Sequence, residues 1–379
     1  MRFNGRVIDL PQQGAFTAEF HKQLDQLGRF NLAIFGKTGV GKSTLVNAVF
    51  GEPLAQTGIG APVTEGSHLY LDQRGTLGLL DTKGVEIGRD DKRLAKDLQA
   101  EVTKRRNLPI AEQIHAAWYC VRGMDRRFED SEAALVTELA DLELPVLVVL
   151  TQVPKNGNDY HPDAVALADA IEARGLPIVG GRPLMTNAVG DQFTGQSAHG
   201  LIDLLQATFR VSPEAVRTAL IVAQRVDMAA KAKSAQVQIA STVAAAAGVA
   251  AVPIPFADAT VLVPLQLAMM ARIAHLYNVP LGTAAAMAAV SSIAATEGGR
   301  RIATGLVKLV PGAGAIVGGA IGASVASALT AAVGGAWLTV CQMAAKGAFD
   351  REDGSVDTDQ VREVFRKEFA NRFRRRNRD

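Results

Sequence analysis

A phosphate-binding loop near the start of the chain constrains the fold more than any other feature. Residues 36–43 read Gly-Lys-Thr-Gly-Val-Gly-Lys-Ser, which fills every fixed position of the pattern G-x-x-x-x-G-K-[ST]. An apolar, strand-like run at 30–35 precedes it, and an apolar pattern with helical spacing at 44–50 follows it. In that context the loop amides and the helix dipole surround a phosphate. The sequence therefore predicts that Lys42 contacts the β- and γ-phosphates of a nucleotide and that Ser43 ligates Mg²⁺.

Around this loop, apolar runs of strand length alternate with polar segments of helix length. The strand-like runs lie at 29–35, 67–72, 76–80, 114–121, 145–151 and 177–186. The helix-like segments lie at 42–50, 90–106, 129–141, 161–174 and 197–209. Strands separated by helices predict βαβ units and a mostly parallel sheet. We therefore expect an α/β nucleotide-binding domain at 29–210, after an N-terminal helical extension at 1–28.

Two further motifs stand where a γ-phosphate and its metal ion would be bound. Asp81 closes the apolar run at 77–80, and Gly84 follows three residues later. An Asp that ends a buried strand beside a phosphate loop holds the Mg²⁺ shell, and the Gly84 amide can reach the γ-phosphate. Thr64, between the loop and this strand, offers a hydroxyl oxygen to Mg²⁺ and an amide to the γ-phosphate. We expect Ser43, Thr64 and Asp81 to ligate Mg²⁺.

In this order the motifs resemble the Era-like branch of the translation-factor-type GTPases, over residues 30 to about 210. The resemblance implies a Ras-like fold, GTP and GDP as ligands with Mg²⁺, and a nucleotide-driven switch. It implies catalytic roles for Lys42, Thr64 and Gly84. It also implies a nucleotide-binding set made of Gly36, Lys37, Thr38, Gly39, Val40, Gly41, Lys42, Ser43, Thr44, Thr151, Gln152, Asn187 and Ala188.

The base-reading segments depart from that family's pattern. Its guanine-reading motif, [NT]-K-x-D, follows the fifth strand, where this chain has Thr-Gln-Val-Pro at 151–154. The family's Asp accepts hydrogen bonds from guanine, and Pro154 cannot. Guanine selectivity is therefore expected to be weaker, or to come from Gln152 or the asparagines at positions 156 and 158. The family's last base-contacting loop, [ST]-A, is matched in part at Asn187-Ala188, and GTP stays the favoured nucleotide.

Hydrolysis is expected to be slow. In Ras-like enzymes a Gln directly after D-x-x-G orients the attacking water, and this chain has Val85 there. The resemblance is to GTPases with a hydrophobic residue at this position, in which a group from elsewhere completes the site, often on dimerisation. Lys37, Arg126 and Arg127 are candidate charges for that role, although both arginines also suit an ordinary solvated loop. Gly39 stands where potassium-activated relatives carry Asn, so no potassium ligand is indicated.

From residue 211 the strand-like signals stop and the chain becomes poor in charge. A helix-start pattern, Ser-Pro-Glu at 212–214, predicts a helix at about 213–233. Charge-free stretches follow at 234–257, 259–271, 279–296 and 309–345. The last exceeds the roughly 20 residues that span a bilayer, and Gly314, Gly318 and Gly322 share one helix face within it. A membrane hairpin and a tightly packed soluble bundle both fit this pattern.

A second resemblance covers this half of the chain. The segment Val252–Asp258, the methionines at 269 and 270, and residues 273–277 are similar to an uncharacterised helical domain. That domain follows Era-like GTPase domains in some bacterial proteins and is often regarded as membrane-associated. The resemblance implies an architecture and no particular reaction. We expect an all-α domain at 211–356.

The chain ends in a basic segment at 357–379. Val361, Phe365, Phe369 and Phe373 recur every four residues and form an apolar helical stripe next to a cluster of arginines. A polybasic helix suits an anionic leaflet, at up to about 1 kcal/mol per basic residue. The alternative is a helix docked on the bundle through this stripe, with a basic tail.

Charge and targeting signals bound the cellular setting. Residues 1–210 carry 22 Lys and Arg against 26 Asp and Glu, and the remaining residues carry 18 against 12. A basic second half suits an anionic partner. The N-terminus has no apolar core of signal-peptide length, and the two cysteines lie far apart. We expect a cytoplasmic protein at the inner membrane surface.

Together these features predict a Mg²⁺-dependent GTP-binding switch with slow hydrolysis and a helical effector domain. The expected partners are an anionic membrane surface and a second copy bound through the GTPase domain. Two rival functions stay open. One is a ribosome-assembly GTPase, although no RNA-binding module follows the GTPase domain. The other is a nucleotide-gated structural or pore-forming protein with little turnover.

Overall fold

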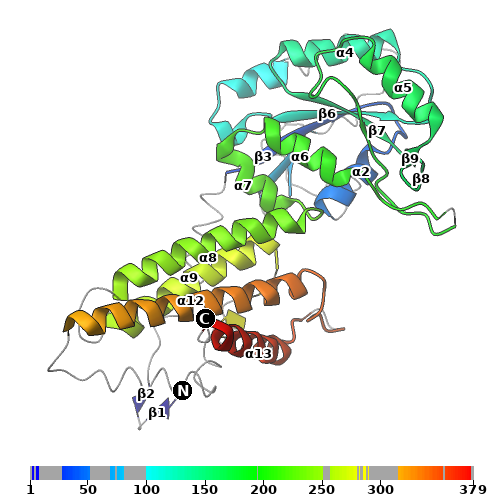
Figure 1. Ribbon diagram of the computed structural model, residues 1–379. Coiled ribbons are helices and arrows are strands. Elements are labelled where there is room, and N and C mark those ends of the chain that lie inside the picture. Colours follow the sequence, from blue (N-terminus) through cyan, green and yellow to red (C-terminus); the bar gives the residue numbers. More distant parts are fainter. Residues whose placement is uncertain are drawn as a thin grey trace. The chain divides into compact units, whose positions relative to one another are not determined.

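The computed structural model divides the chain into two compact units (Figure 1). The nucleotide unit is residues 27–228, and the helical unit is residues 1–26 with 229–379. The structure describes residues 2–3, 6–7, 28–51, 69–72, 75–80, 100–193, 195–250, 257–279, 281, 285–286, 289, 315–352 and 355–376.

A six-stranded sheet forms the centre of the nucleotide unit. Its strands are β3 Phe30–Phe35, β4 Leu69–Leu71, β5 Leu77–Leu80, β6 Ala116–Arg122, β7 Val146–Thr151 and β10 Leu184–Met185. They lie in the order β10-β7-β6-β3-β5-β4, and neighbours are parallel except for the antiparallel edge pair of β4 and β5. The predicted α/β fold with a mostly parallel sheet is confirmed.

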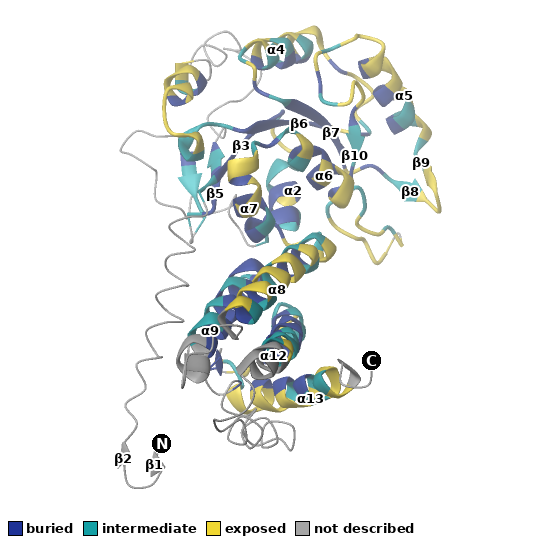
Figure 2. Ribbon diagram, turned by 60° about the vertical axis from the view of Figure 1, so that its left-hand side comes forward, coloured by how far each residue is buried: buried dark blue, intermediate teal, exposed yellow. Residues whose placement is uncertain are grey.

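Helices cover both faces of this sheet. They are α2 Lys42–Phe50, α4 Asp130–Asp141, α5 Pro162–Glu172, α6 Leu201–Val211 and α7 Glu214–Ala223. Successive side chains of a strand point to opposite faces. Leu32 and Ile34 of β3 therefore pack with α2, α6 and α7, whereas Ala33 and Phe35 pack with α4 and α5. Figure 2 shows the central strands in the buried class, so the core consists of two apolar layers around the sheet.

Two strand regions of the nucleotide unit differ from the prediction. The strand expected at 177–186 is confined to β10, because Gly180 and Gly181 have positive φ angles of 78° and 70° that interrupt an extended chain. An antiparallel hairpin that no sequence pattern predicted follows β7. This hairpin consists of β8 Lys155–Asn156 and β9 Asp159–Tyr160.

The helix expected at 213–233 is broken. Helix α7 ends at Ala223, and α8 spans Met228–Ala250. The side-chain oxygen of Gln224 accepts hydrogen bonds from the backbone amides of Val226 and Asp227, at 2.8 and 2.7 Å. A side chain that binds these amides competes with the helical hydrogen-bond pattern, so the helix stops there.

The helical unit consists mainly of long helices. With α8, these are α9 Ala257–Tyr277, α12 Ala315–Ala344 and α13 Thr358–Arg376. Trp337 of α12 is buried, donates its indole N–H to the Met270 carbonyl of α9 at 2.8 Å, and meets Phe365 of α13 edge-on. Buried Trp side chains satisfy their N–H in this way. Helix α12 is therefore held between α9 and α13.

At the start of the chain, β1 Arg2–Phe3 and β2 Arg6–Val7 pair antiparallel. These residues are therefore not helical, contrary to the expectation for the N-terminal extension. Residues 8–27 of that extension lie outside the described residues.

Two neighbouring glycines in α12 allow close packing. A Cβ on Gly334 would lie 2.8 Å from Ile239 of α8 and 3.0 Å from Met269 of α9. A Cβ on Gly335 would lie 3.0 Å from the Arg372 side chain of α13. The stripe that the sequence analysis singled out lies earlier: Gly314 and the side-chain surroundings of 318 and 322 are outside the described part. That stripe stays a prediction.

Helix α13 docks on α12 through its apolar stripe. Val361, Phe365 and Phe369 are buried, and the rings of Phe365, Phe369 and Phe373 are stacked in sequence. The guanidinium of Arg372 donates to the Thr339 hydroxyl of α12 at 3.0 Å. The docked-helix alternative for the chain's end is therefore confirmed over the described residues of α13.

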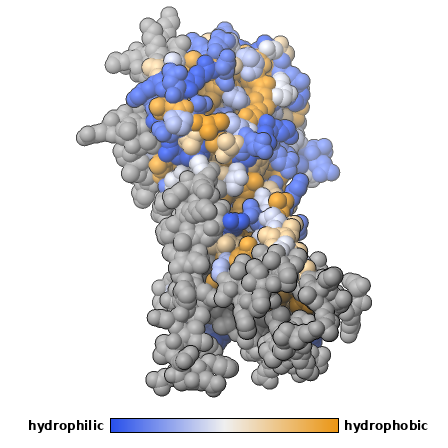
Figure 3. Space-filling view, turned by 90° about the vertical axis from the view of Figure 1, so that its left-hand side faces the viewer, coloured by the Kyte–Doolittle hydropathy of each residue, from blue (hydrophilic) through white to orange (hydrophobic). Residues whose placement is uncertain are grey.

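One helix of the described part resembles a membrane span in its length and composition only. Within the described residues, Ala323–Ala344 of α12 is long and apolar enough to cross a bilayer, with 22 residues and a mean hydropathy of 1.5. More than half of this window, 56%, is nevertheless buried inside the protein, as in the core helix of a soluble bundle. On the face drawn in Figure 3, hydrophilic and apolar residues are interspersed over the described surface.

Candidate functional site

The phosphate loop has the backbone that its glycines predict. Gly36, Gly39 and Gly41 have positive φ angles of 128°, 81° and 96°. L side chains rarely adopt this conformation. A Cβ on Gly36 would also collide with the Cys120 carbonyl of β6. The loop therefore packs its backbone closely against β6, and its glycines have the conformation that a phosphate-binding loop requires.

Lys42 lies over the loop at the start of α2. Its ammonium group donates to the carbonyls of Gly36 and Lys37, at 2.6 and 2.9 Å. Ser43 is next to it, in the first turn of the same helix. Burial raises the pKa of the nearby Cys120 thiol to about 12, although the Lys42 charge opposes the shift. Cys120 is therefore a neutral thiol beside the loop.

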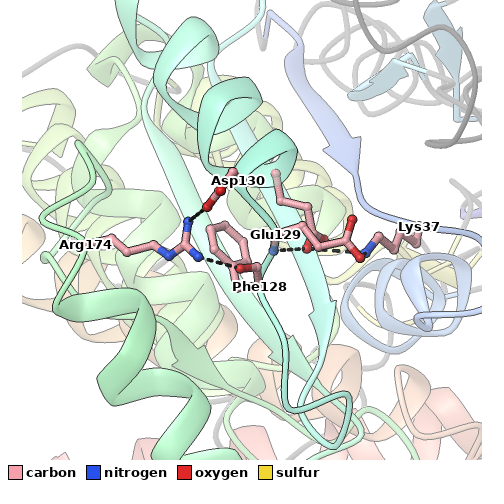
Figure 4. Close-up of polar contacts among 6 residues, drawn as sticks. Lys37, Phe128, Glu129, Asp130 and Arg174 are labelled. Atoms are coloured by element: carbon pink, nitrogen blue, oxygen red, sulfur yellow. Dashed lines mark hydrogen bonds and ion pairs between the residues drawn. The ribbon is translucent and has the colours of Figure 1, made fainter.

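Lys37 connects the loop to α4 (Figure 4). Its ammonium group lies 2.8 Å from Glu129 and 3.4 Å from the buried Glu132. The two glutamates also form the capping box of α4. Burial lowers the pKa of Lys37, but the hydrogen bond and charge of Glu129 and the charge of Glu132 outweigh this and raise it. Lys37 is thus charged and paired on the flank of the loop.

The other candidate charges lie between β6 and α4. Arg126, at a φ of 55°, pairs with Asp163 at 2.6 Å, and Arg127 is exposed. The same connection is braced by Arg174, which donates to Asp130 and to the Phe128 carbonyl, both at 2.8 Å (Figure 4). Lys37 and Arg126 are therefore both engaged in ion pairs, and the catalytic role suggested for them stays a prediction.

Thr151 and Gln152 support the phosphate loop from the end of β7. The Thr151 hydroxyl donates to the Val40 carbonyl of the loop and lies 3.2 Å from the Val121 carbonyl of β6. Gln152, at a φ of 53°, places its side-chain amide 3.5 Å from the Gly39 carbonyl. The segment that reads the base in the family is thus physically joined to the phosphate cradle.

The two predicted base loops are brought together. The Val153 amide donates to the Thr186 carbonyl at 3.0 Å, and Asn187 exchanges backbone hydrogen bonds with His199. The ring of His199 also lies 3.0 Å from the Val153 carbonyl and contacts Tyr160 of the β8–β9 hairpin. Sequence reasoning missed His199, because nothing local connects it to residues some forty positions earlier.

Pro154 takes part only through its backbone, since its carbonyl accepts from the His161 amide at 3.0 Å. It supplies no carboxylate for guanine. The asparagines at 156 and 158 are exposed on the hairpin, and Gln152 is also exposed. The structure therefore gathers the predicted base-site residues in one place without restoring the missing acid.

The metal and γ-phosphate motifs lie largely outside the described residues. Thr64, Asp81, Gly84 and Val85 fall there. Within the described part, no group of three or more His, Cys, Asp or Glu is placed to hold a metal. The predicted donors, two hydroxyls and one carboxylate, are hard oxygen ligands of the kind that Mg²⁺ prefers. The glycine cradle and Lys42 fit the phosphates that would share this ion.

Comparison with known proteins agrees with this geometry. Residues 31–152 match the family described as 50S ribosome-binding GTPase, and residues 215–373 match a domain of unknown function, DUF697. No curated protein matches the chain.

Two solved structures are distantly similar. A probable GTP-binding protein engB is 15% identical with a TM-score of 0.33, covering 48% of this chain and 97% of its own. A bacterial dynamin pair, described as oligomerised and as sensing and tethering membranes, is 10% identical with a TM-score of 0.31. That match covers 94% of this chain and 82% of the other. The chain therefore carries a P-loop GTPase domain that uses GTP or GDP with Mg²⁺, followed by a DUF697 helical domain.

Proposed function

We propose that this GTPase is a slow molecular switch whose nucleotide state controls the helical unit. The observation that carries the proposal is the bracing of the phosphate loop. Its carbonyls are bound by Lys42, Thr151 and Gln152, and Lys37 ties its flank to α4. A loop held this firmly suits tight nucleotide binding, and the switch segments around Thr64 and Gly84 would respond to the γ-phosphate.

Slow hydrolysis follows from what the site lacks. Val85 cannot orient water as the Gln of Ras-like enzymes does. Lys37 and Arg126 each face a carboxylate, so either would have to leave an ion pair before it could neutralise charge on a transferring phosphoryl group. Lys42, Thr64 and Gly84 are the residues proposed to act on the γ-phosphate. Turnover would then rise when an outside group completes the site.

We propose a second copy of the chain as the source of that group. The loop that follows Asn187 is folded back by a bridge between Asp191 and Gln196. It exposes Phe193 almost completely, at 98%, and Val189 at 58%. An apolar tip next to the base loops supports a protein partner on that edge of the unit. Turnover per molecule should then increase with protein concentration.

The helical unit is proposed to meet an anionic membrane at its surface. Arg362, Arg366, Lys367 and Arg374 are exposed on α13, whereas its Phe stripe is buried against α12. Basic residues near an anionic leaflet contribute roughly 1 kcal/mol each. Because much of the apolar surface of α12 is already covered, peripheral contact through charge is favoured over insertion. We propose that the protein is cytoplasmic and acts at the inner membrane surface.

Flotation of the full chain with liposomes tests this function. The protein should float with anionic vesicles and not with neutral ones, to different extents with GDP and with a non-hydrolysable GTP analogue. The double variant Arg366→Glu with Lys367→Glu should lose flotation, whereas Lys104→Glu, an exposed change in the nucleotide unit, should keep it.

Two outcomes would favour the rivals. The first is co-sedimentation with ribosomes in place of vesicles, which would support a ribosome-assembly role. The second is nucleotide-dependent dye leakage from the vesicles, which would support a pore-forming role for α12. Equal flotation of wild type and the α13 variant would contradict the proposed surface.

A further inference from the structure

The segment that connects the two matched regions is an ordered turn at residues 224–227, which we call the joint. It is attached to α2, the helix that follows the phosphate loop. The DUF697 match begins at residue 215, inside α7. Yet Val216, Ala219 and Leu220 of α7 lie in the same apolar cluster as Leu45 and Val49 of α2. The first helix of the DUF697 match is therefore part of the GTPase core.

Gln224 shapes the joint that follows α7. It is fully buried, and all its polar atoms are bound by the joint itself. Its oxygen accepts from the amides of Val226 and Asp227, and its nitrogen donates to the Asp227 carbonyl at 3.0 Å. A buried side-chain amide that is satisfied entirely by the adjacent backbone fixes that backbone. Residues 224–227 are therefore a defined turn that leads directly into α8 at Met228.

Arg225 attaches this turn to the end of α2. Its amide donates to the Val49 carbonyl at 2.8 Å. The last carbonyls of a helix have no partner within the helix, so this bond satisfies one of them. Its side chain passes directly over Gly51, where any Cβ would collide with the guanidinium. Gly51 also has a φ of 71°, which L side chains rarely adopt.

Helix α2 joins this attachment to the nucleotide site. It has nine residues and is therefore about 13 Å long, with Lys42 and Ser43 at one end and Val49 at the other. Leu45 and Val49 are buried, and Phe50 stacks on the buried Trp118. A short, tightly packed helix moves as a rigid body. A shift at its phosphate end therefore reaches Arg225.

We propose that Arg225 and Gln224 are positioning residues for the nucleotide site, which set α2 through its last turn and couple the bound nucleotide to α8. This proposal rests on the proposed switch function and specifies the residues through which the nucleotide site and α8 are coupled. By linkage, the path works in both directions. A change in the helical unit that moves Met228 also changes nucleotide affinity.

Nucleotide release and hydrogen exchange in the full chain test this path. Gln224→Ala removes the hydrogen bonds that fix the turn, and Arg225→Ala removes the side chain that packs over Gly51. Each should speed release of a fluorescent GDP by about three- to tenfold. Both should remove the difference in amide protection of 228–250 between GDP and a non-hydrolysable GTP analogue. Arg210→Ala, an exposed arginine at the end of α6, is the matched control and should leave both readouts unchanged.

The outcomes separate the two levels of the proposal. Suppose that wild type shows the protection difference and that both variants keep it, with normal GDP release. The proposed coupling path through residues 224–227 is then wrong, whereas the proposed switch function is kept. If wild type shows no difference, the switch and the joint both fail. Should Gln224→Ala unfold, Arg225→Ala decides alone, because its side chain is exposed and its backbone bond to Val49 persists.

Discussion

The phosphate loop and helix α12 both depend on glycine, but for different physical reasons. Gly36, Gly39 and Gly41 have backbone angles that other residues avoid, so the loop's own conformation requires them. Gly334 and Gly335 lie in an ordinary helix and are required by what touches them, the side chains of α8, α9 and α13. The first requirement is local and the second is tertiary. The loop glycines should therefore matter for nucleotide binding, whereas the α12 glycines should matter for the packing of the helical unit.

The largest effect should come from the loop's cation. Lys42→Ala should reduce GTP affinity by more than about a hundredfold, because two or more charge-assisted hydrogen bonds to phosphates are worth roughly 1.5–3 kcal/mol each. Calorimetry on the full chain measures this. Lys104→Ala, an exposed lysine away from the loop, is the control and should bind normally. An unchanged GTP affinity in Lys42→Ala would contradict the assignment of this loop as the phosphate-binding site.

Substitutions of two helical glycines test whether close packing explains the glycines of α12. Gly334→Ala should destabilise the helical unit by about 1–3 kcal/mol, the usual cost of overpacking, because its Cβ meets Ile239 and Met269. Gly248→Ala in α8 meets open space, so it should stabilise by up to about 1 kcal/mol. Denaturant unfolding measures both. Two changes of the same sign would show that the contacts of α12 do not decide the outcome.

The base site should respond to a restored acid. Pro154→Asp places a carboxylate where the family reads guanine, so preference for GTP over ATP should rise about tenfold or more, on the 1–3 kcal/mol scale of bidentate base contacts. Competition binding measures the ratio. Asn158→Asp adds the same charge on the exposed hairpin and should change the ratio little. A strong guanine preference in wild type would mean that another residue already reads the base.

A smaller, pH-dependent effect comes from a buried histidine at the start of the sheet. The Nδ1 atom of His115 accepts from the backbone amide of Asn31 at 2.8 Å, and its Nε2 atom lies 2.7 Å from the Ile110 carbonyl. Burial lowers its pKa below the ordinary value of 6.5, with a further contribution from the Arg29 charge. Below about pH 6.5 the unfolded chain then binds more protons than the folded one, so stability should fall as the pH decreases. Above pH 6.5 both states carry a neutral His115, so this histidine should no longer make the stability depend on pH.

Denaturant unfolding of the nucleotide unit between pH 5 and 7.5 measures that slope, and His115→Asn should flatten it. A wild-type stability that does not change across this range would rule out the neutral, buried state assigned to His115.

The outcome of sequence reasoning follows the same division between local and tertiary causes. The loop at 36–43, the sheet and α2 were predictable because each depends on a short pattern, and the structure confirms them. The break at Gln224 was missed because Gln is a good helix former whose side chain here binds the next turn. In α12, composition alone could not show which of many glycines would meet a neighbour.

We propose that nucleotide state and the helical unit are coupled, and linkage gives a direct way to measure this coupling. The affinities of the full chain for GDP and for a non-hydrolysable GTP analogue are measured with and without anionic vesicles. Coupling of the usual size changes the ratio of the two affinities by about 5- to 150-fold. We expect such a change, and it should equal the ratio of the vesicle affinities of the two nucleotide states. A ratio that vesicles leave unchanged, in a protein that binds both, would contradict it.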